Sequence, residues 1–258
     1  MLGKAFGRDE VPRPFNLAGE QVALGVFTHR TTYLPGLLGS LRRIGDPPCV
    51  VVCADGPINA NMERLWRALQ RTKARYWVFL DDDIEFLGGD VLGDCVRAMV
   101  RHRWAGCSIF STFDPEHKER AERFGDYELW RRELLDQGII EERDAGWMTG
   151  YFMMVDRDQV GDIGPDMNLP DPCTAIDTSY SVAIRARGYR LGLVPHVCYH
   201  TKKEVWAQKD IIHKVERYLL AKWGMFYWDC VQYTGCVLQW PGAANWRREK
   251  PECLEDEQ

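Results

Sequence analysis

Three short, apolar segments alternate with two helical patterns in the first third of the chain, and this alternation constrains the fold more than any other feature. The apolar segments read QVALGVFTH at 21–29, CVVVCA at 49–54 and YWVFL at 76–80. Between them, apolar residues at 34, 37, 38 and 41, and again at 62, 65, 66 and 69, recur at the spacing of one helix face. Apolar strands joined by helices are typical of a parallel sheet covered on both faces. The sequence therefore predicts an α/β fold with a mostly parallel, Rossmann-like sheet.

The second half of the chain continues the pattern less regularly. Residues 114–143 are dense in charge and are expected to be helical or looped, whereas 146–155 (GWMTGYFMMV) is apolar again. The periodicity predicts a helix at 175–187 that Gly188 ends, followed by a strand at 190–200. These elements extend the predicted sheet.

The domain organisation follows from these segments. Residues 1–20 are expected to form a lead-in segment, and residues 21–203 the principal domain, with a first half at 21–113 and a second half at 114–203. An amphipathic helix at 204–223, with an acidic tail after it, is expected to pack on that domain as a C-terminal extension at 204–258.

Composition narrows the class of protein. The chain has 258 residues, and its 33 basic and 38 acidic side chains leave a net charge of −5, so it has no general basic footprint for nucleic acid. No uninterrupted apolar stretch of about 18 residues occurs, and the N-terminus shows no apolar signal-peptide core. The nine cysteines include no C-x-x-C pair, which disfavours a zinc knuckle or a disulfide framework. We therefore expect a reduced, cytoplasmic protein without an integral membrane segment.

Three consecutive aspartates, Asp81, Asp82 and Asp83, follow the apolar segment YWVFL directly. Ligands bind at the carboxyl ends of strands in such sheets. Carboxylates at that edge suit a hard divalent cation such as Mg²⁺ or Mn²⁺. A solvated turn is the alternative interpretation, since aspartate favours turns.

The segment around the three aspartates resembles a known protein family. VFLDDDIEF is similar to the DxD segment of family 2 glycosyltransferases, which have the GT-A fold. Four other segments resemble the same family in the same order: FTHRTTYLPGLLGSL, VVVCADGP, GWMTGYFMMVDRD and AIDTSYSVAIRARGYRLGLVP. The resemblance covers roughly residues 20 to 202. It implies a metal-dependent, inverting glycosyltransferase that uses a nucleotide-diphosphate sugar, such as a UDP- or GDP-sugar.

The resemblance also implies roles for the donor-side residues. Thr28 and Asp55 would hold the nucleotide base, and Arg30 would lie near the base or the phosphates. Asp81 would face the ribose, and Asp82 belongs to the same nucleotide-binding group. The register of the metal ligand within the triplet stays open by one residue.

The metal and the catalytic base are implied in the same way. Asp83 and His200 would hold Mn²⁺ or Mg²⁺, although His196 competes with His200 as the ligand. Asp177 would be the catalytic base. Its position before an apolar-periodic helix also fits a helix N-cap.

The acceptor side is less defined. Trp147 and Met148 follow Gly146, where the family often places acceptor contacts, although Trp147 fits core packing equally well. The loop GDIGPDMNLPDP carries Asp162, Asp166 and Asp171, and it fits an acceptor-side or lid loop better than a second metal site.

Several functions remain open from the sequence. The acceptor hydroxyl would lie on a glycan, a lipid-linked molecule or a small molecule. Clusters of tryptophan and arginine at 101–104, 130–132 and 246–248 would also suit a hydroxymethylated base in viral DNA. A nucleotidyltransferase and an inactive nucleotide-sugar binding module are two further interpretations. The former usually has a glycine-rich, lysine-containing loop after the first strand, which FTHRTTYLPG lacks.

Overall fold

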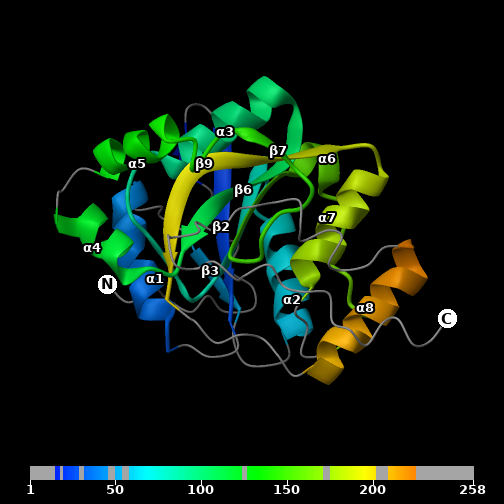
Figure 1. Ribbon diagram of the computed structural model, residues 1–258. Helices are drawn as coiled ribbons and strands as arrows, with labels where there is room; N and C mark the ends of the chain where they lie inside the picture. Colours follow the sequence, from blue (N-terminus) through cyan, green and yellow to red (C-terminus); the bar gives the residue numbers. More distant parts are fainter. Residues whose placement is uncertain are drawn as a thin grey trace.

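Figure 1 shows the computed structural model of the protein. It describes residues 15–17, 20–28, 32–45, 50–53, 58–123, 127–170, 175–201 and 209–224. Within these ranges the chain forms one mixed sheet with helices packed on both of its faces.

Nine strands of the described residues form this sheet. They are β1 (Phe15–Leu17), β2 (Glu20–Phe27), β3 (Val50–Cys53), β4 (Tyr76–Asp81), β5 (Ile84–Phe86), β6 (Trp104–Thr112), β7 (Arg143–Ala145), β8 (Phe152–Asp156) and β9 (Arg190–His200). The strand order is β1-β2-β4-β8-β6-β9-β5, with β3 paired to β2 and β7 paired to β9. The strands β2, β3 and β4 are mutually parallel, as are β6 and β9, whereas β8 runs antiparallel between β4 and β6. The carboxyl ends of β2, β4, β6 and β9 therefore meet the start of β8 at one edge of the sheet.

The helices divide between the two faces. Their bounds are α1 (Leu34–Ser40), the 3₁₀ helix η1 (Leu41–Ile44), α2 (Ile58–Gln70), α3 (Val91–His102), α4 (Pro115–Arg123), α5 (Tyr127–Asp136), α6 (Arg157–Val160), α7 (Ile176–Ala186) and α8 (Lys209–Trp223). One face carries α1, η1 and α3, and the opposite face carries α2, α7 and α8. The pair α4 and α5 packs against β9 around a third, smaller apolar cluster.

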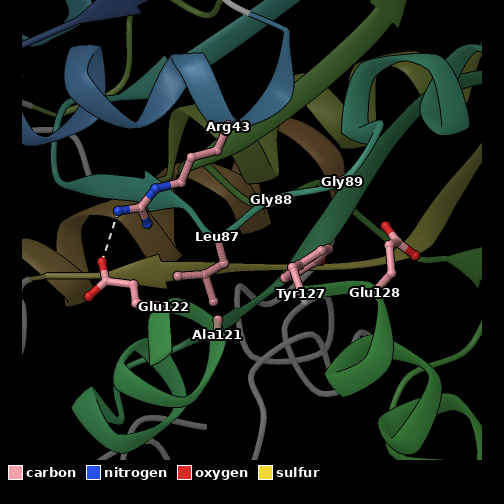
Figure 2. A pocket seen from close by; sticks show the side chains of 8 residues that line it. All are labelled: Arg43, Leu87, Gly88, Gly89, Ala121, Glu122, Tyr127 and Glu128. Atoms are coloured by element: carbon pink, nitrogen blue, oxygen red, sulfur yellow. Dashed lines mark hydrogen bonds and ion pairs between the residues drawn. The ribbon is translucent and has the colours of Figure 1, made fainter. Parts of the chain in front are cut away.

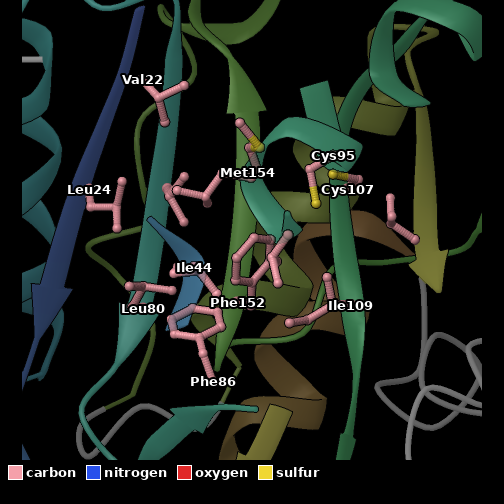
Figure 3. Close-up of a cluster of buried hydrophobic side chains, with 14 of the residues drawn as sticks. Val22, Leu24, Ile44, Leu80, Phe86, Cys95, Cys107, Ile109, Phe152 and Met154 are labelled. Carbon is pink, nitrogen blue, oxygen red and sulfur yellow. The ribbon is translucent and has the colours of Figure 1, made fainter. Parts of the chain in front are cut away.

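Strand β4 shows why this sequence builds two hydrophobic layers. Side chains alternate between the faces of a strand, so Tyr76, Val78 and Leu80 pack toward α1 and α3. Trp77 and Phe79 pack toward α2 and α7. Figure 3 shows the first of these layers, where Leu80 lies near Phe86 and Phe152. A strand buried on both faces has to be apolar throughout, as YWVFL is.

The structure confirms the predicted α/β fold and each element named from periodicity, with boundaries shifted by a few residues. Gly188 ends α7 as predicted: its backbone has a φ of +84°, and its N–H donates to the carbonyl of Arg185 at 2.8 Å. The apolar segment at 146–155 gives β8, which is antiparallel to its neighbours. Helix α3 and strand β6 were not predicted from the sequence, and no strand was predicted at β1, β5 or β7.

The predicted helix at 204–223 is observed as α8, and Val215 and Leu219 bury its apolar side against the layer that includes α7. In the part of the chain that the structure describes, no helix has both the length and the apolarity needed to cross a membrane. The proposed division into lead-in, domain and extension remains a prediction.

Candidate functional site

The three aspartates form the turn between β4 and β5, and each is tied to a different strand. The N–H of Asp81 donates to the carbonyl of Tyr151, just before β8, at 3.4 Å. The carboxylate of Asp82 accepts a hydrogen bond from the hydroxyl of Thr28, at the end of β2. The carbonyl of Asp83 accepts hydrogen bonds from both the N–H and the hydroxyl of Thr201, after β9, each at 2.8 Å. These hydrogen bonds fix the turn at the sheet edge, so it is not a solvent-exposed turn without tertiary contacts.

Thr28 is itself held from the helix side. The side-chain amide of Asn61, in α2, donates to the carbonyl of Thr28 at 2.7 Å. Thr28 and Asn61 are both buried. The structure thus brings Thr28 and Asp82 together, and their role in nucleotide binding stays a prediction. Arg30 and Asp55, the other predicted nucleotide contacts, lie outside the described residues.

Asp83 and His200 form a close pair. Strand β5 pairs with β9 so that Ile84 lies opposite His200, which places the His200 Nε2 atom 3.1 Å from the Asp83 Oδ1 atom. Phe113 stacks on the imidazole at 4.7 Å between ring centroids, and the ring of Tyr151 lies 5.6 Å away. Both members of the pair are largely buried.

His196 lies in a different environment. Its Nε2 atom is 2.8 Å from a carboxylate oxygen of Asp94 in α3, and its Nδ1 atom is 3.2 Å from the hydroxyl of Tyr127. The His196 side chain is 0% exposed. Burial lowers the pKa of His196, and the hydrogen bond from that imidazole holds the pKa of Asp94 well below its usual range. Of the two histidines, only His200 contacts the aspartate turn.

Asp83 and His200 form a hydrogen-bonded pair with 3.1 Å between the Oδ1 and Nε2 atoms. A carboxylate oxygen and an imidazole nitrogen are ligand types that Mg²⁺ or Mn²⁺ can take. No group of three or more His, Cys, Asp or Glu side chains gathers as a metal centre within the described ranges. Two protein ligands suit Mg²⁺ or Mn²⁺ that completes its shell with water and phosphate oxygens. The Nδ1 atom of His200 is buried and has no hydrogen-bond partner among the described residues.

Asp177 is the second residue of α7, and it does not cap that helix. The N-cap position belongs to Ala175, so the capping interpretation of Asp177 is wrong. One carboxylate oxygen accepts from the N–H of Gly150 at 2.9 Å, and the other accepts from the N–H of Thr178 at 2.8 Å. Burial nevertheless outweighs these hydrogen bonds and raises the pKa of Asp177 to about 7.

Asp177 is joined to the aspartate turn through two consecutive residues. Gly150 donates to its carboxylate, and the carbonyl of the next residue, Tyr151, accepts from Asp81. A carboxylate with a pKa near 7 is suited to exchange protons at neutral pH. The sheet edge thus combines a candidate metal pair with a candidate base.

The two predicted acceptor contacts have different surroundings. Trp147 is 8% exposed, and its indole N–H is buried with no partner within the described residues. Met148 is 0% exposed and belongs to the apolar layer beneath α7. A fully buried side chain offers an acceptor no surface, so the structure argues against direct contact by Met148.

The acidic loop ties α7 to α8. The carboxylate of Asp166 accepts from the hydroxyl of Ser179 at 3.1 Å, from that of Tyr218 at 2.9 Å, and from the amine of Lys222 at 2.6 Å. Asp162 pairs with Arg187 at the end of α7. These carboxylates are used in structural contacts, and Asp171 lies outside the described residues.

Two of the three clusters of tryptophan and arginine, those at 101–104 and 130–132, offer no stacking surface for DNA. Trp104 and Trp130 are buried core residues, so neither indole ring can stack on an extruded base. Trp246 lies outside the described residues. The two described clusters therefore give no support to a DNA acceptor, which stays an untested alternative.

Phe113, Gly150 and Thr201 are among the residues of the site that were not found from the sequence. Phe113 stacks on His200, Gly150 donates to Asp177, and Thr201 fixes the carbonyl of Asp83. Two of these contacts use backbone groups of the site, which carry no signal in residue type. The position of Thr201 next to His200 was the one available indication.

Comparisons with known proteins bear on the fold. No protein-family model and no curated protein matches the sequence. Among solved structures, the chain is similar to the mannosyltransferase PcManGT from Pyrobaculum calidifontis in complex with GDP-Man and Mn²⁺, with a TM-score of 0.51, 14% identity, and coverage of 83% of this chain and 65% of that one. It is also similar to GalNAc-T7 with UDP, GalNAc and Mn²⁺, with a TM-score of 0.50, 12% identity, and coverage of 69% and 43%.

TarS 1-349 from S. aureus is a further match, with a TM-score of 0.47, 12% identity, and coverage of 77% of this chain and 65% of that one. The chain thus spans less than two thirds of each of these three solved chains. The expected GT-A fold is confirmed by the first two structures.

Proposed function

We propose that the protein is a glycosyltransferase that moves a sugar from a nucleotide-diphosphate donor to a hydroxyl acceptor, with a divalent metal at Asp83 and His200. The observation that carries this proposal is the joint placement of the Asp83–His200 pair and the raised-pKa carboxylate of Asp177 at one edge of a GT-A sheet.

The donor side follows from the chemistry of the leaving group. When the bond between sugar and diphosphate breaks, the diphosphate gains negative charge, which Mn²⁺ or Mg²⁺ held by Asp83 and His200 would neutralise. Thr28, Asp81 and Asp82 would contact the nucleotide, together with Arg30 and Asp55 of the predicted group. Thr28 and Asp82 follow the adjacent strands β2 and β4. Their positions support a single nucleotide-binding site.

The acceptor hydroxyl must lose a proton as it attacks the anomeric carbon. Asp177, whose pKa is raised to about 7, is suited to accept that proton. Inverting transfer needs one base and no covalent intermediate, and Asp177 alone would serve as that base. Trp147 remains a proposed contact of the acceptor.

The fold comparisons support this proposal. The solved structures of PcManGT and GalNAc-T7 contain GDP-Man with Mn²⁺ and UDP with GalNAc and Mn²⁺, respectively. A UDP- or GDP-sugar is therefore the proposed donor for this chain.

The experiment is product analysis after incubation with UDP- and GDP-sugars, Mn²⁺ and a panel of hydroxyl acceptors. A glycosyltransferase releases UDP or GDP and extends an acceptor. The native chain is expected to do so, and Asp177→Asn is expected to bind the donor without transfer. Release of pyrophosphate would instead identify a nucleotidyltransferase. Donor binding without any turnover would identify an inactive binding module.

A further inference from the structure

The edge of the sheet opposite the aspartate turn carries a group of basic side chains. Strand β4 begins at Tyr76, opposite the last residue of β8, and β6 begins at Trp104, opposite the first residue of β9. These strand ends meet at one edge, about 20 Å from the aspartate turn, because β4 has six residues. We call this surface the basic edge. It is defined by Lys73, Arg75, Arg103, Arg185 and Arg190.

The residues of the basic edge are neighbours. The guanidinium of Arg190 donates to the carbonyl of His102, which directly precedes Arg103, at 3.1 Å. Arg185, in the last turn of α7, lines the same depression as Arg190. The other two members of the edge directly precede β4, and β8 alone separates β4 from β6. The starts of β4 and β6 therefore lie about 10 Å apart.

Several of these cations have no acidic partner. Arg75 and Arg190 are ion-paired. The side chains of Lys73 and Arg103, in contrast, are exposed and form no hydrogen bond or ion pair within the described residues. The exposed side chain of Arg185 donates to a backbone carbonyl and has no carboxylate partner there. Positive charge at this edge is thus available to an external anion.

Another group of charged side chains provides a contrast. Figure 2 shows the open depression between η1, α4 and α5, where the guanidinium of Arg43 donates to the carboxylate of Glu122 at 2.8 Å. Glu128, which also lines this depression, accepts from Arg131 at 2.9 Å. The charges there neutralise one another, so that surface offers an anion nothing comparable to the basic edge.

Lys73 and Arg103 also occupy backbone positions that favour glycine. Their φ angles are +58° and +56°, and no other non-glycine residue in the described part of the chain has a positive φ. This left-handed conformation is unfavourable for a residue with a Cβ atom. The ends of η1, α5, α7 and α8 use glycine for it, at positions 45, 138, 188 and 224. Backbone geometry therefore does not explain a lysine after α2 and an arginine after α3.

Stabilisation of the helix dipoles is the other explanation for cations at these two helix ends. The two explanations predict opposite effects of a change to glycine. If the cations stabilise the helix ends, glycine lowers the stability of the fold. If they are present for a ligand, glycine relieves the left-handed backbone and raises stability while ligand binding is lost.

The chemistry of the basic edge suits the phosphates of a nucleic-acid duplex. Guanidinium and ammonium groups bind phosphate oxygens, and a duplex presents one negative charge per about 1.7 Å of its axis. Single strands also use exposed aromatic rings for stacking, and the large apolar side chains that are exposed in the described ranges include no aromatic. Helices that bind membrane surfaces insert several apolar side chains, whereas the ends of α2, α3 and α7 expose one, Val100. A duplex is therefore the favoured partner.

We propose that the basic edge binds the phosphate backbone of duplex nucleic acid without reading its sequence. Because this edge lies at the opposite end of β4 from the aspartate turn, the bound stretch of duplex is held away from the candidate base. The surface therefore attaches the protein to the polymer and does not position an acceptor. This binding requires neither nucleotide nor metal, and it is independent of the proposed transfer reaction. The net charge of −5 opposes association at long range, so we expect binding at low salt.

The test is fluorescence anisotropy of a labelled DNA duplex of about 20 base pairs, titrated with the full chain at about 50 mM and 200 mM salt. We expect binding at the lower salt, and three phosphate contacts should make it about 40-fold weaker at the higher salt. Lys73→Gly and Arg103→Gly should each weaken binding about three- to tenfold and reduce the salt slope by about one. Each variant should also have a higher melting temperature than the native chain.

Arg132→Ala is the matched control, because it removes an exposed arginine of α5 that has no ion pair within the described residues. It should bind the duplex as the native chain does. Absence of duplex binding at low salt, or native affinity in both glycine variants, would overturn the inference. Binding to phosphatidylserine vesicles but not to the duplex would overturn it in favour of a membrane surface. Lower melting temperatures in the glycine variants, with unchanged duplex binding, would assign the two cations to the helix ends alone.

Discussion

The carboxylate of Asp177 accepts a hydrogen bond from the backbone N–H of Gly150 at 2.9 Å, although 27 residues separate them in the chain. The residue after Gly150 is Tyr151, whose carbonyl accepts from Asp81 at the aspartate turn. The start of α7 is thus anchored to the same backbone segment that anchors the end of β4. The candidate base and the candidate metal pair consequently share one rigid support.

Replacement of Asp177 by asparagine keeps the shape of the side chain and removes its ability to accept a proton. We expect Asp177→Asn to lose about 10²–10⁴-fold in the transfer rate while the affinity for the donor stays within a factor of about two. Single-turnover measurements of transfer, combined with donor titration, check this. Near-native transfer by the variant would exclude Asp177 as the base.

The pKa of Asp177 also sets the pH dependence of transfer. Because its pKa is raised to about 7, the carboxylate is mostly protonated at pH 6 and mostly ionised at pH 8. The transfer rate of the native chain should therefore rise about tenfold per unit below pH 7 and level off above it. A rate that is constant between pH 5 and pH 8 would contradict a base with this pKa.

The same pKa predicts a change in stability with pH. In the unfolded chain, the pKa of Asp177 returns to about 3.8, so between about pH 4 and pH 7 the folded state binds the additional proton. Protonated Asp177 therefore contributes to the free energy of unfolding. That contribution is present in full below pH 4 and is lost as the pH rises through 7. The melting temperature of the native chain should thus fall relative to that of Asp177→Asn between pH 4 and pH 8. Parallel melting curves would show that Asp177 titrates normally.

His200 should contribute to metal affinity, whereas an exposed histidine should not. We expect His200→Ala to weaken Mn²⁺ binding in the presence of UDP or GDP at least tenfold, since it removes one of the two proposed protein ligands. His102→Ala is the control, because His102 pairs with Glu142 at a distant surface. Paramagnetic relaxation by Mn²⁺ measures both affinities directly. Equal affinities in the two variants would remove His200 from the metal site.

Two glycines provide a contrast that tests the packing of the fold. A Cβ atom at Gly192, in β9, would lie 2.0 Å from the ring of Trp104, whereas one at Gly39, in α1, would meet nothing within 4 Å. Gly192→Ala should lower the free energy of unfolding by about 2–3 kcal/mol through overpacking. Gly39→Ala should raise it by about 0.5–1 kcal/mol, because alanine is the better helix former. Urea denaturation measures both changes, and equal effects would indicate a different packing of β9 on Trp104.

The fold could be predicted where apolar patterns are local. The run YWVFL and the spacing of Leu65 and Leu69 depend only on neighbours along the chain, and both β4 and α2 were identified from them. The antiparallel direction of β8 could not be read in this way, because strand direction depends on which distant strand pairs with it. Helix α3 and strand β6 were also missed.

The candidate site could likewise be predicted only where the signal lies in the residue type itself. Residue type and the family resemblance identified Asp83, Asp177 and His200, which the structure places at one edge. The choice between His200 and His196 required the pairing of β5 with β9, since a register shift of a few residues would exchange their positions. The contact of Gly150 with Asp177 uses a backbone N–H, which any residue except proline supplies.

The central claim is that a nucleoside diphosphate binds through a metal held by Asp83, and calorimetric titration of UDP and GDP tests it most directly. The native chain should bind one of the two in Mn²⁺ and lose that binding in EDTA. Asp83→Asn, which keeps the size of the side chain, should lose the metal-dependent binding, whereas Asp136→Asn, an exposed position on α5, should retain it. Nucleotide binding of equal strength in Mn²⁺ and EDTA, or in Asp83→Asn and the native chain, would contradict the account.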